Sequence, residues 1–217
     1  MNAGRLARWY RPIEYAAFGR SLERCRFAFL PRLASARRIL ILGEGDGRSL
    51  AQLLRIAPLA DIDVVEISPE MIALAKRRAG DADRVRFLCD DALKGRWPAR
   101  YYDAIVTSFF LDCFTEGDAR RLIPRLADCL APGGIWLINE FAIPDNGWRR
   151  RHAQLWIRTM YLFFRVTTGL QARQLPPISA IMREEGMRCI DRDQRRAGFI
   201  VSEVWTPADD LSRRFSE

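Results

Sequence analysis

The length, composition and charge of the chain exclude several classes of protein. With 217 residues, 49% of them hydrophobic and 29% charged, it has the size and composition of one globular domain, and no apolar run approaches the roughly 18 residues of a membrane span. The net charge of +8 comes almost entirely from arginines, which are spread along the chain instead of gathered in one stripe, so we expect no nucleic-acid partner.

The cysteines and the first residues add two further expectations. Five scattered cysteines without a Cys-x-x-Cys pair, together with a single histidine, predict reduced thiols and no metal site. The first ten residues lack the apolar stretch of a secretory signal, so we expect a cytoplasmic protein.

The first predicted elements are an amphipathic segment and a short buried strand. Residues 5–30 alternate arginines with apolar and aromatic residues at near-helical spacing, interrupted by Pro12 and stopped by Pro31. This pattern predicts one or two short helices ahead of the core. Residues 38–42 then form an apolar run that ends abruptly at Gly43, which is typical of a buried strand in a parallel sheet.

Strands and helices then alternate along most of the chain. Ser68 and Pro69 supply a side-chain cap and a first-turn proline for the second helix. Two stretches near the end are joined by only three residues, which permits an antiparallel hairpin but no parallel return. The alternation predicts a doubly wound, mostly parallel sheet. The predicted strands are 62–67, 85–88, 103–107, 135–139 and the hairpin of 187–195 and 199–206, and the predicted helices are 49–56, 69–80 and 117–130.

Chemistry is expected beyond the carboxyl ends of these strands, where open α/β sheets bind ligands. Three glycines, at 43, 45 and 47, follow the first strand and let a ligand approach the backbone closely. Glu66 ends the second strand, where a carboxylate accepts hydrogen bonds from ribose hydroxyls, and Asp90 ends the third. These positions predict a site for an adenosine-type cofactor. Its candidate residues are Gly43, Glu44, Gly45, Gly47, Glu66, Ile67, Met71, Asp90, Asp91, Ala92, Ser108 and Phe109.

A dinucleotide is the obvious competitor for such a turn. Its fingerprint has a third glycine at the sixth position, and this chain has Arg48 there. The carboxylates of Glu44, Asp46, Glu66 and Asp90 would repel a pyrophosphate and attract a sulfonium cation. The residues therefore favour S-adenosyl-L-methionine over a dinucleotide.

Residues 39–206 resemble the class I S-adenosylmethionine-dependent methyltransferase family. The resemblance implies S-adenosyl-L-methionine as the methyl donor and adenosylhomocysteine as the product. It also implies an α/β, Rossmann-like doubly wound sheet of seven strands, mostly parallel with an antiparallel last strand. The segments that carry it are 39–47, 65–66, 87–92, 102–106 and 130–134, followed by the hairpin.

The segments expected on the acceptor side differ more from the general family pattern. Residues 139–144 also resemble the ubiquinone/menaquinone biosynthesis branch of the family, in which a Glu-Phe pair and a nearby proline follow the fifth strand. An insertion follows between residues 147 and 168, with aromatic and aliphatic residues on one face and arginines on the other. Three interpretations of the insertion stay open: packing on the core, a lid over a hydrophobic acceptor, and a helix at a membrane surface.

The predicted function is transfer of a methyl group to a small, hydrophobic or aromatic acceptor. The cofactor carries the reactivity, so the protein mainly aligns the acceptor and excludes water. A catalytic base is needed where the acceptor must lose a proton, and the candidates are Asp112, Glu140, His152 and Tyr161.

Two alternatives belong to other classes. An RNA methyltransferase would carry an Asn-Pro-Pro-Tyr type of turn after the fourth strand, where residues 108–111 read Ser-Phe-Phe-Leu. A catalytically silent domain would keep the fold and bind a partner through its arginines. The expected organisation is an N-terminal helical segment, 1–36, as a pocket cover, a methyltransferase domain, 37–206, with a substrate insertion at about 145–175, and a tail, 207–217.

Overall fold

The computed structural model describes residues 18–144, 147–168 and 172–208. Of the expected N-terminal helices, the described part is α2 (Ser21–Phe27) and a short 3₁₀ turn, η1 (Leu30–Leu33). Pro31 lies inside η1 instead of stopping the helix, because a proline fits the first turn of a helix, where no intrahelical N–H bond is needed. Residues 5–17 of the prediction lie outside the described residues.

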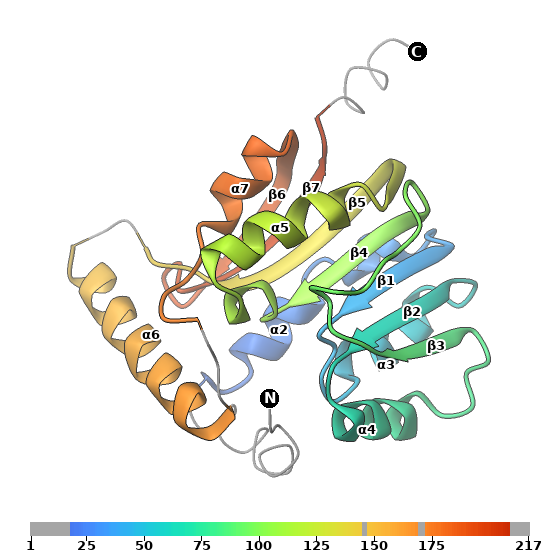
Figure 1. The fold of residues 1–217 in the computed structure, drawn as a ribbon, viewed down its shortest axis with the longest axis horizontal. Helices are drawn as coiled ribbons and strands as arrows, with labels where there is room; N and C mark the ends of the chain where they lie inside the picture. The colour runs from blue at the N-terminus through green and yellow to red at the C-terminus, as the bar shows by residue number, and fades with distance from the viewer. Residues whose placement is uncertain (1–17, 145–146, 169–171, 209–217) are drawn as a thin grey trace.

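Seven strands form one sheet in the order β3-β2-β1-β4-β5-β7-β6, as Figure 1 shows. Neighbouring strands from β3 to β5 are parallel, and β7 is antiparallel to both β5 and β6. The predicted seven-stranded, mostly parallel Rossmann-like sheet is therefore confirmed. The strands are β1 (Arg38–Leu42), β2 (Asp61–Glu66), β3 (Val85–Cys89), β4 (Tyr102–Ser108), β5 (Leu130–Phe141), β6 (Met187–Arg195) and β7 (Ile200–Pro207).

Most helices also follow the sequence pattern. Ser68 caps α4 by accepting a hydrogen bond from the backbone N of Met71 at 3.3 Å, and Gly80 ends the same helix. The seven-residue α7, which begins after two prolines, was not predicted, because a segment this short shows too little periodicity. The helices of the core are α3 (Arg48–Ile56), α4 (Pro69–Ala79), α5 (Glu116–Ala127) and α7 (Ile178–Glu184).

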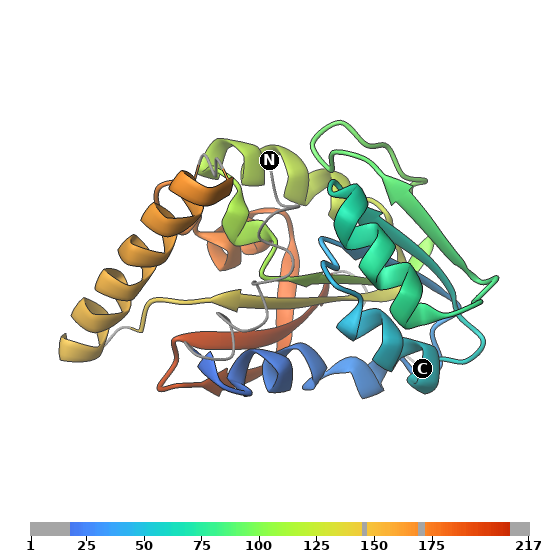
Figure 2. The ribbon, with the colours of Figure 1, turned by 90° about the horizontal axis from the view of Figure 1, so that it is seen from below.

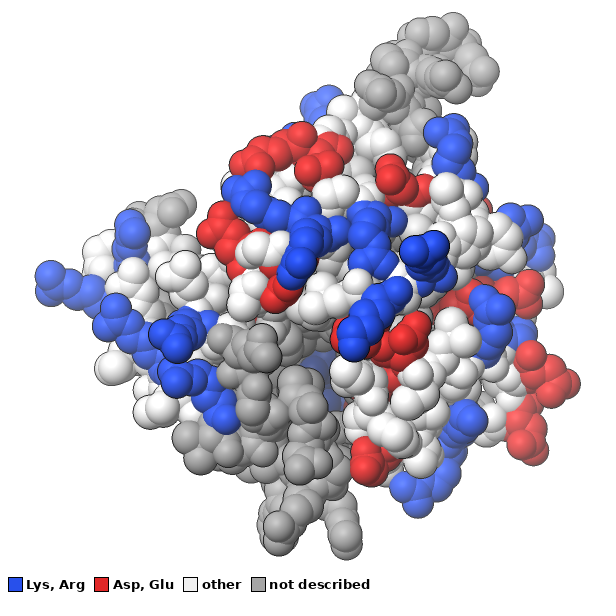
Figure 3. Space-filling view, viewed as in Figure 1, with Lys and Arg blue, Asp and Glu red and all other residues white. Residues whose placement is uncertain are grey.

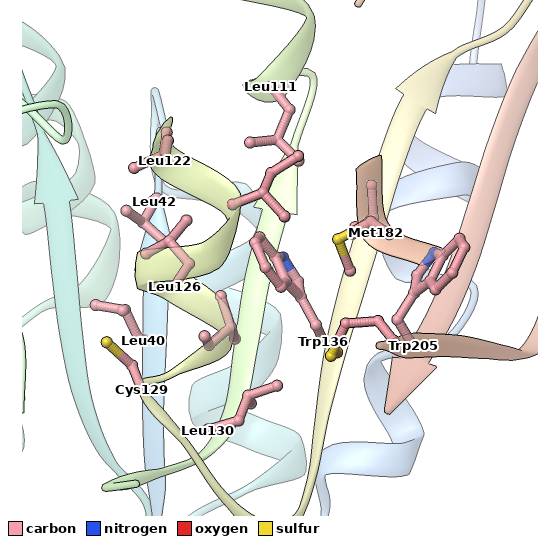
Figure 4. Packing of buried hydrophobic residues seen from close by; sticks show 14 of the residues in the cluster. Leu40, Leu42, Leu111, Leu122, Leu126, Cys129, Leu130, Trp136, Met182 and Trp205 are labelled. Atoms are coloured by element: carbon pink, nitrogen blue, oxygen red, sulfur yellow. The ribbon is translucent and has the colours of Figure 1, made fainter. Parts of the chain in front are cut away.

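Alternating side chains of the buried strands form a core on each face of the sheet. Leu40 and Leu42 of β1 point to the face covered by α5 and α7, and Ile39 and Ile41 point to the face covered by α3 and η1. Figure 2 shows α5 on one side of the sheet, with α2 and α3 on the other. On the α5 side, the fully buried indoles of β5 and β7 fill the space beneath α7 (Figure 4).

A third apolar cluster lies beyond the carboxyl end of β5. It joins Phe18 before α2, Phe141 at the end of β5 and Phe199 before β7 to the inner face of α6 (Gly147–Thr168). Ile157 and Tyr161 are the largest side chains that α6 buries there. The bounds of α6 agree with the predicted insertion, and the helix lies at the carboxyl end of β5 (Figure 1). Within the described residues, no helix has the length and apolar character that a membrane crossing needs.

Candidate functional site

The turn after β1 depends on glycine for two separate reasons. Gly43 and Gly47 have φ angles of +67° and +86°, which side chains with a Cβ rarely adopt. A Cβ on Gly47 would also lie 2.6 Å from the Cα of Ala75, and a Cβ on Gly43 would collide with the ring of Phe110. Gly47 therefore allows α3 to pack closely on α4.

Glu66 connects this turn to the end of β2. Its Oε2 accepts a hydrogen bond from the backbone N of Gly45 at 3.2 Å, and its Oε1 accepts one from the backbone N of Ser68 at 3.0 Å. A Cβ on Gly45 would meet nothing within 4 Å among the residues that the structure describes, and these residues leave the backbone open beside this carboxylate. The turn and Glu66 together leave an accessible backbone next to a negative charge.

The other two acidic residues of the turn make contacts within the protein. Glu44 accepts a hydrogen bond from the backbone N of Leu50 at 2.9 Å, in the first turn of α3, and burial raises its pKa to about 7. Asp46 is held by Arg48 at 3.0 Å and by Arg78 at 3.1 Å. Of the four carboxylates that were expected to attract a cation, Glu44 and Asp46 therefore also hold the turn and the start of α3 in place.

The carboxyl ends of β2 and β3 carry the next candidates. Glu66 pairs with Cys89 in the sheet, so Asp90 directly follows the neighbouring strand end, and its side chain is exposed. Asp91 instead accepts a hydrogen bond from the backbone N of Leu93 at 3.0 Å and shapes the following turn. Of the other candidates here, Ile67 is exposed, Met71 is half-buried and Ala92 lies in the core.

Hydrogen bonds join the end of β4 to the end of β5. Phe109 has a φ of +53°, rare for a residue with a large side chain, and its backbone N donates to the carbonyl of Asn139 at 2.7 Å. The Asn139 side chain donates to the Ser108 hydroxyl at 2.8 Å. The ring of Phe109 packs on that of Phe141, with centroids 5.0 Å apart. Backbone strain of this kind is concentrated at functional sites.

Beside this strained turn, two acidic side chains are buried together. Glu140 is 3% exposed and Asp112, in the 3₁₀ turn η2 (Leu111–Cys113), is 6% exposed. The Oε1 of Glu140 accepts hydrogen bonds from the backbone N atoms of Phe110 and Leu111, at 3.2 and 2.8 Å. Its Oε2 is buried and has no hydrogen-bond partner among the residues that the structure describes. We call Asp112 and Glu140 the acid pair.

Burial favours the protonated form of each carboxyl group of the acid pair. Burial raises the pKa of Asp112 to about 6. Burial and then the negative charge of Asp112 raise the pKa of Glu140 well above its usual range. Two carboxyl groups this close share protons as a unit, so one of them is poised to accept a proton near neutral pH.

The two remaining catalytic candidates lie in different places. The hydroxyl of Tyr161, on the inner face of α6, donates to the backbone carbonyl of Asp112 at 2.7 Å, so the structure brings Tyr161 to the acid pair. His152 lies on an exposed part of α6 beside Trp148, with ring centroids 6.5 Å apart. It lines a different hollow from the one that Glu140 lines.

A cavity of about 350 Å³ lies between the ends of β5 and β7 and the segment before α7. Glu140 lines it together with Glu203, a residue missed from the sequence. Glu203 is 3% exposed, forms an ion pair with Arg192 at 3.0 Å and accepts a hydrogen bond from the Trp205 indole at 2.9 Å. Its one sequence signal is an acidic residue within an otherwise uncharged strand. The apolar walls include Ile138, Phe141, Leu175 and Ile178.

Comparison with known proteins agrees with this geometry. Residues 39–134 match the family model described as a methyltransferase domain. A demethylmenaquinone methyltransferase of Thermus thermophilus is 34% identical over 133 residues, which cover 60% of each chain. A 3-hydroxy-5-methyl-1-naphthoate 3-O-methyltransferase of Streptomyces sahachiroi is 32% identical over 117 residues, 52% of this chain and 33% of that protein. The chain thus spans less than two thirds of these relatives.

A solved structure supports the fold. The N-methyltransferase NodS of Bradyrhizobium japonicum, in complex with S-adenosyl-L-homocysteine, superposes with a TM-score of 0.63 at 20% identity, over 85% of this chain and 87% of that one. At this identity the likeness concerns the fold alone. The matched domain and the relatives are similar to methyltransferases, in agreement with the resemblance seen in the sequence, and S-adenosyl-L-methionine is the expected cofactor.

Proposed function

We propose that this chain is an S-adenosylmethionine-dependent methyltransferase whose acceptor is a small, apolar molecule with one hydroxyl or amine group. One observation carries the proposal. In a chain similar to methyltransferases, the open turn at Gly45 is hydrogen-bonded to Glu66, and the buried acid pair lies across the sheet at the ends of β4 and β5. A cofactor side and a proton-accepting side therefore meet at the same edge of the sheet.

The residues around the turn fit the cofactor. Glu66, beside the open turn, would accept hydrogen bonds from the ribose hydroxyls, and the exposed carboxylate of Asp90 would accept one from the adenine amino group. The uncovered backbone at Gly45 leaves room for the methionine part. When bound, the cofactor supplies an electrophilic methyl group on a sulfonium. Ser108 and Phe109 would close this side of the site.

The cavity lined by Glu140 supports an apolar acceptor with a hydrogen-bond donor. Its volume of about 350 Å³ lies in the range of small-molecule sites, and its walls are largely apolar. A hydroxyl or amine donor would satisfy the unpartnered Oε2 of Glu140. The relatives are named for demethylmenaquinone and a hydroxynaphthoate, both fused-ring aromatic molecules. We infer a fused-ring phenol or quinol as the class of acceptor.

The acid pair would take the proton that the acceptor loses. A carboxylate of Asp112 or Glu140 would accept the hydroxyl proton while the acceptor oxygen takes the methyl group that the cofactor would supply. Tyr161 is a positioning residue, because its hydroxyl holds the backbone carbonyl of Asp112. Glu140 also positions η2 through its bonds to Phe110 and Leu111.

A methyl-transfer assay tests the proposal. Purified protein is incubated with radiolabelled S-adenosylmethionine and either a panel of naphthols and naphthoquinols or extracted total RNA. We expect label in the organic phase with at least one fused-ring phenol. Label in RNA would instead support an RNA methyltransferase. Salt-sensitive retention on nucleic acid without any methyl transfer would support a silent binding protein.

Several further expectations stay predictions. They are a cytoplasmic location, the domain boundaries and the role of residues 1–36 as a pocket cover. The described part of that segment packs on the core, since Leu22 and Cys25 join the third cluster and Leu30 and Leu33 lie beneath the sheet. The assay can be repeated without residues 1–17 to test whether they restrict access to the site.

A further inference from the structure

The outer face of α6 carries an exposed apolar row. Trp148, Leu155 and Leu162 recur at every seventh residue and are 73%, 63% and 59% exposed. Residues this far apart lie along one side of a helix, and the row spans about 20 Å. The opposite side already packs on the core through Ile157 and Tyr161. A surface helix needs only one apolar face, so the outer row calls for a separate explanation.

A row of arginines runs beside the apolar row. Arg151, Arg158 and Arg165 also recur at every seventh residue and are exposed, and Arg149 and Arg150 precede them. The helix contains no aspartate or glutamate. In Figure 3 the lobe that α6 forms, at the left, shows blue side chains and no red ones on its visible face. This helix therefore combines five positive charges with an exposed apolar row.

A hollow of about 430 Å³ continues the apolar row at one end. Trp148 belongs to both the row and the hollow, whose other walls include Phe18, Trp156 and Phe199. Arg149 and Arg196 are also part of its lining. Aromatic walls with basic residues suit an anionic, amphipathic molecule.

We propose that the outer face of α6 binds the surface of a lipid bilayer that contains anionic headgroups. Helices that lie in the plane of a membrane interface combine tryptophan and leucine on one side with arginines beside them, as here. The apolar row would enter the boundary between headgroups and acyl chains, and the arginines would contact phosphates. The proposal does not depend on the methyl acceptor or on the cofactor.

Two other occupants fit this face less well. A second copy of the chain would bring five more arginines against these five, with no acidic side chain on either helix to pair with them. A nucleic acid would neutralise the arginines but would leave Trp148, Leu155 and Leu162 in water. Of these three occupants, only an anionic surface with an apolar layer beneath it would pair with the arginines and also bury the apolar row.

Co-sedimentation with lipid vesicles tests the proposal. The full chain is mixed with vesicles made of phosphatidylcholine alone, or with vesicles in which about 30% of the phosphatidylcholine is replaced by anionic phosphatidylglycerol. We expect binding to the anionic vesicles that weakens as salt rises. Replacing Arg151, Arg158 and Arg165 together by Gln should reduce the partition coefficient about 100-fold, since each arginine contributes separately. Replacing Trp148, Leu155 and Leu162 by Gln should reduce it more than about tenfold.

Matched variants control for charge and for exposed apolar surface. Gln at the exposed Arg55, Arg77 and Arg188 removes the same charge elsewhere, and Leu59→Gln removes a leucine that is 68% exposed. Both controls should bind vesicles like the wild type. All substituted side chains are exposed, so circular dichroism and the thermal midpoint should stay unchanged.

Three results would overturn the proposal. The first is a lack of binding to anionic vesicles by the wild-type chain. The second is full binding by the variant that lacks the apolar row, because the contact would then be nonspecific charge attraction. The third is a wild-type chain that is a dimer by light scattering while this same variant is a monomer, because a second copy would then occupy the face. Each readout is independent of methyl transfer, so failure here leaves the proposed function standing.

Discussion

The two ends of the candidate site differ in whether backbone or side-chain atoms form them. The cofactor end, at β1 to β3, consists of backbone held in place by Gly43, Gly47 and Glu66. The acceptor end, at β4, β5 and α6, consists of buried side chains, above all the acid pair of Asp112 and Glu140. A backbone site serves one cofactor in many chains, whereas a site of side chains can change its acceptor by substitution. Variants that affect one end without the other test this comparison.

The largest expected effect is on the acceptor end. Asp112→Asn should lower kcat by about 1,000-fold if the acid pair takes the proton of the acceptor, because general base catalysis contributes on this scale. The affinity for adenosylhomocysteine should not change. The wild-type rate should rise with pH through about 6, as Asp112 loses its proton, and the variant should lack this rise. If Asp112→Asn lowered kcat and the affinity for adenosylhomocysteine by the same factor, the two ends would not act separately.

Glu140→Gln serves as the companion variant. The amide oxygen of glutamine can still accept from Phe110 and Leu111, so η2 should keep its position. Wild-type kcat with a wild-type pH profile in both variants would exclude the acid pair from proton transfer.

The next effect concerns the packing beneath the cofactor end. Gly47→Ala places a Cβ 2.6 Å from the Cα of Ala75 at a φ of +86°, so we expect a loss of about 3 kcal/mol in the free energy of unfolding. Gly186→Ala is the control, because Gly186 has a φ of +70° with nothing within 4 Å of its Cβ, and we expect a loss of about 1 kcal/mol. If urea denaturation gave equal losses in the free energy of unfolding for the two variants, the close packing of α3 on α4 at Gly47 would contribute nothing to stability.

The smallest effect is a gain in stability at the cofactor end. Burial raises the pKa of Glu44 from 4.5 to about 7, so the folded chain holds this proton more tightly than the unfolded chain. The stabilisation is complete below pH 4.5 and is lost as the pH rises to about 7. Glu44→Gln keeps an acceptor for Leu50 and should be about 2 kcal/mol more stable than the wild type at pH 8.

The measurement is the urea midpoint across pH 5 to 8. The exposed Glu185→Gln provides the control and should keep the wild-type pH dependence. A Glu44→Gln variant less stable than the wild type at pH 8 would mean that the carboxylate is needed to cap α3.

The two ends also differ in how far the sequence predicted them. At the cofactor end, the turn, the strand ends and Glu66 follow from local patterns, because parallel strands place their carboxyl ends side by side. The contacts that Glu44 and Asp46 make within the protein were not predicted. Their partners, Leu50 and Arg78, lie on helices whose orientation depends on packing, so the sequence alone does not place them.

At the acceptor end the sequence named residues without their arrangement. Asp112, Glu140 and Tyr161 were candidates, but their contacts span 29 to 49 residues and exist only after folding. Glu203 was missed, because an acidic residue in a strand ordinarily faces water. The α6 insertion was predicted with its bounds, and packing of its inner face on the core was one of the interpretations left open.

Calorimetric titration with adenosylhomocysteine tests the central claim most directly. The wild-type chain should bind one equivalent, and Glu66→Gln should bind about tenfold more weakly, because the ribose then loses a charged hydrogen-bond acceptor. Asp112→Asn should bind like the wild type. Absence of binding heat across several temperatures, from a folded wild-type chain, would contradict the account.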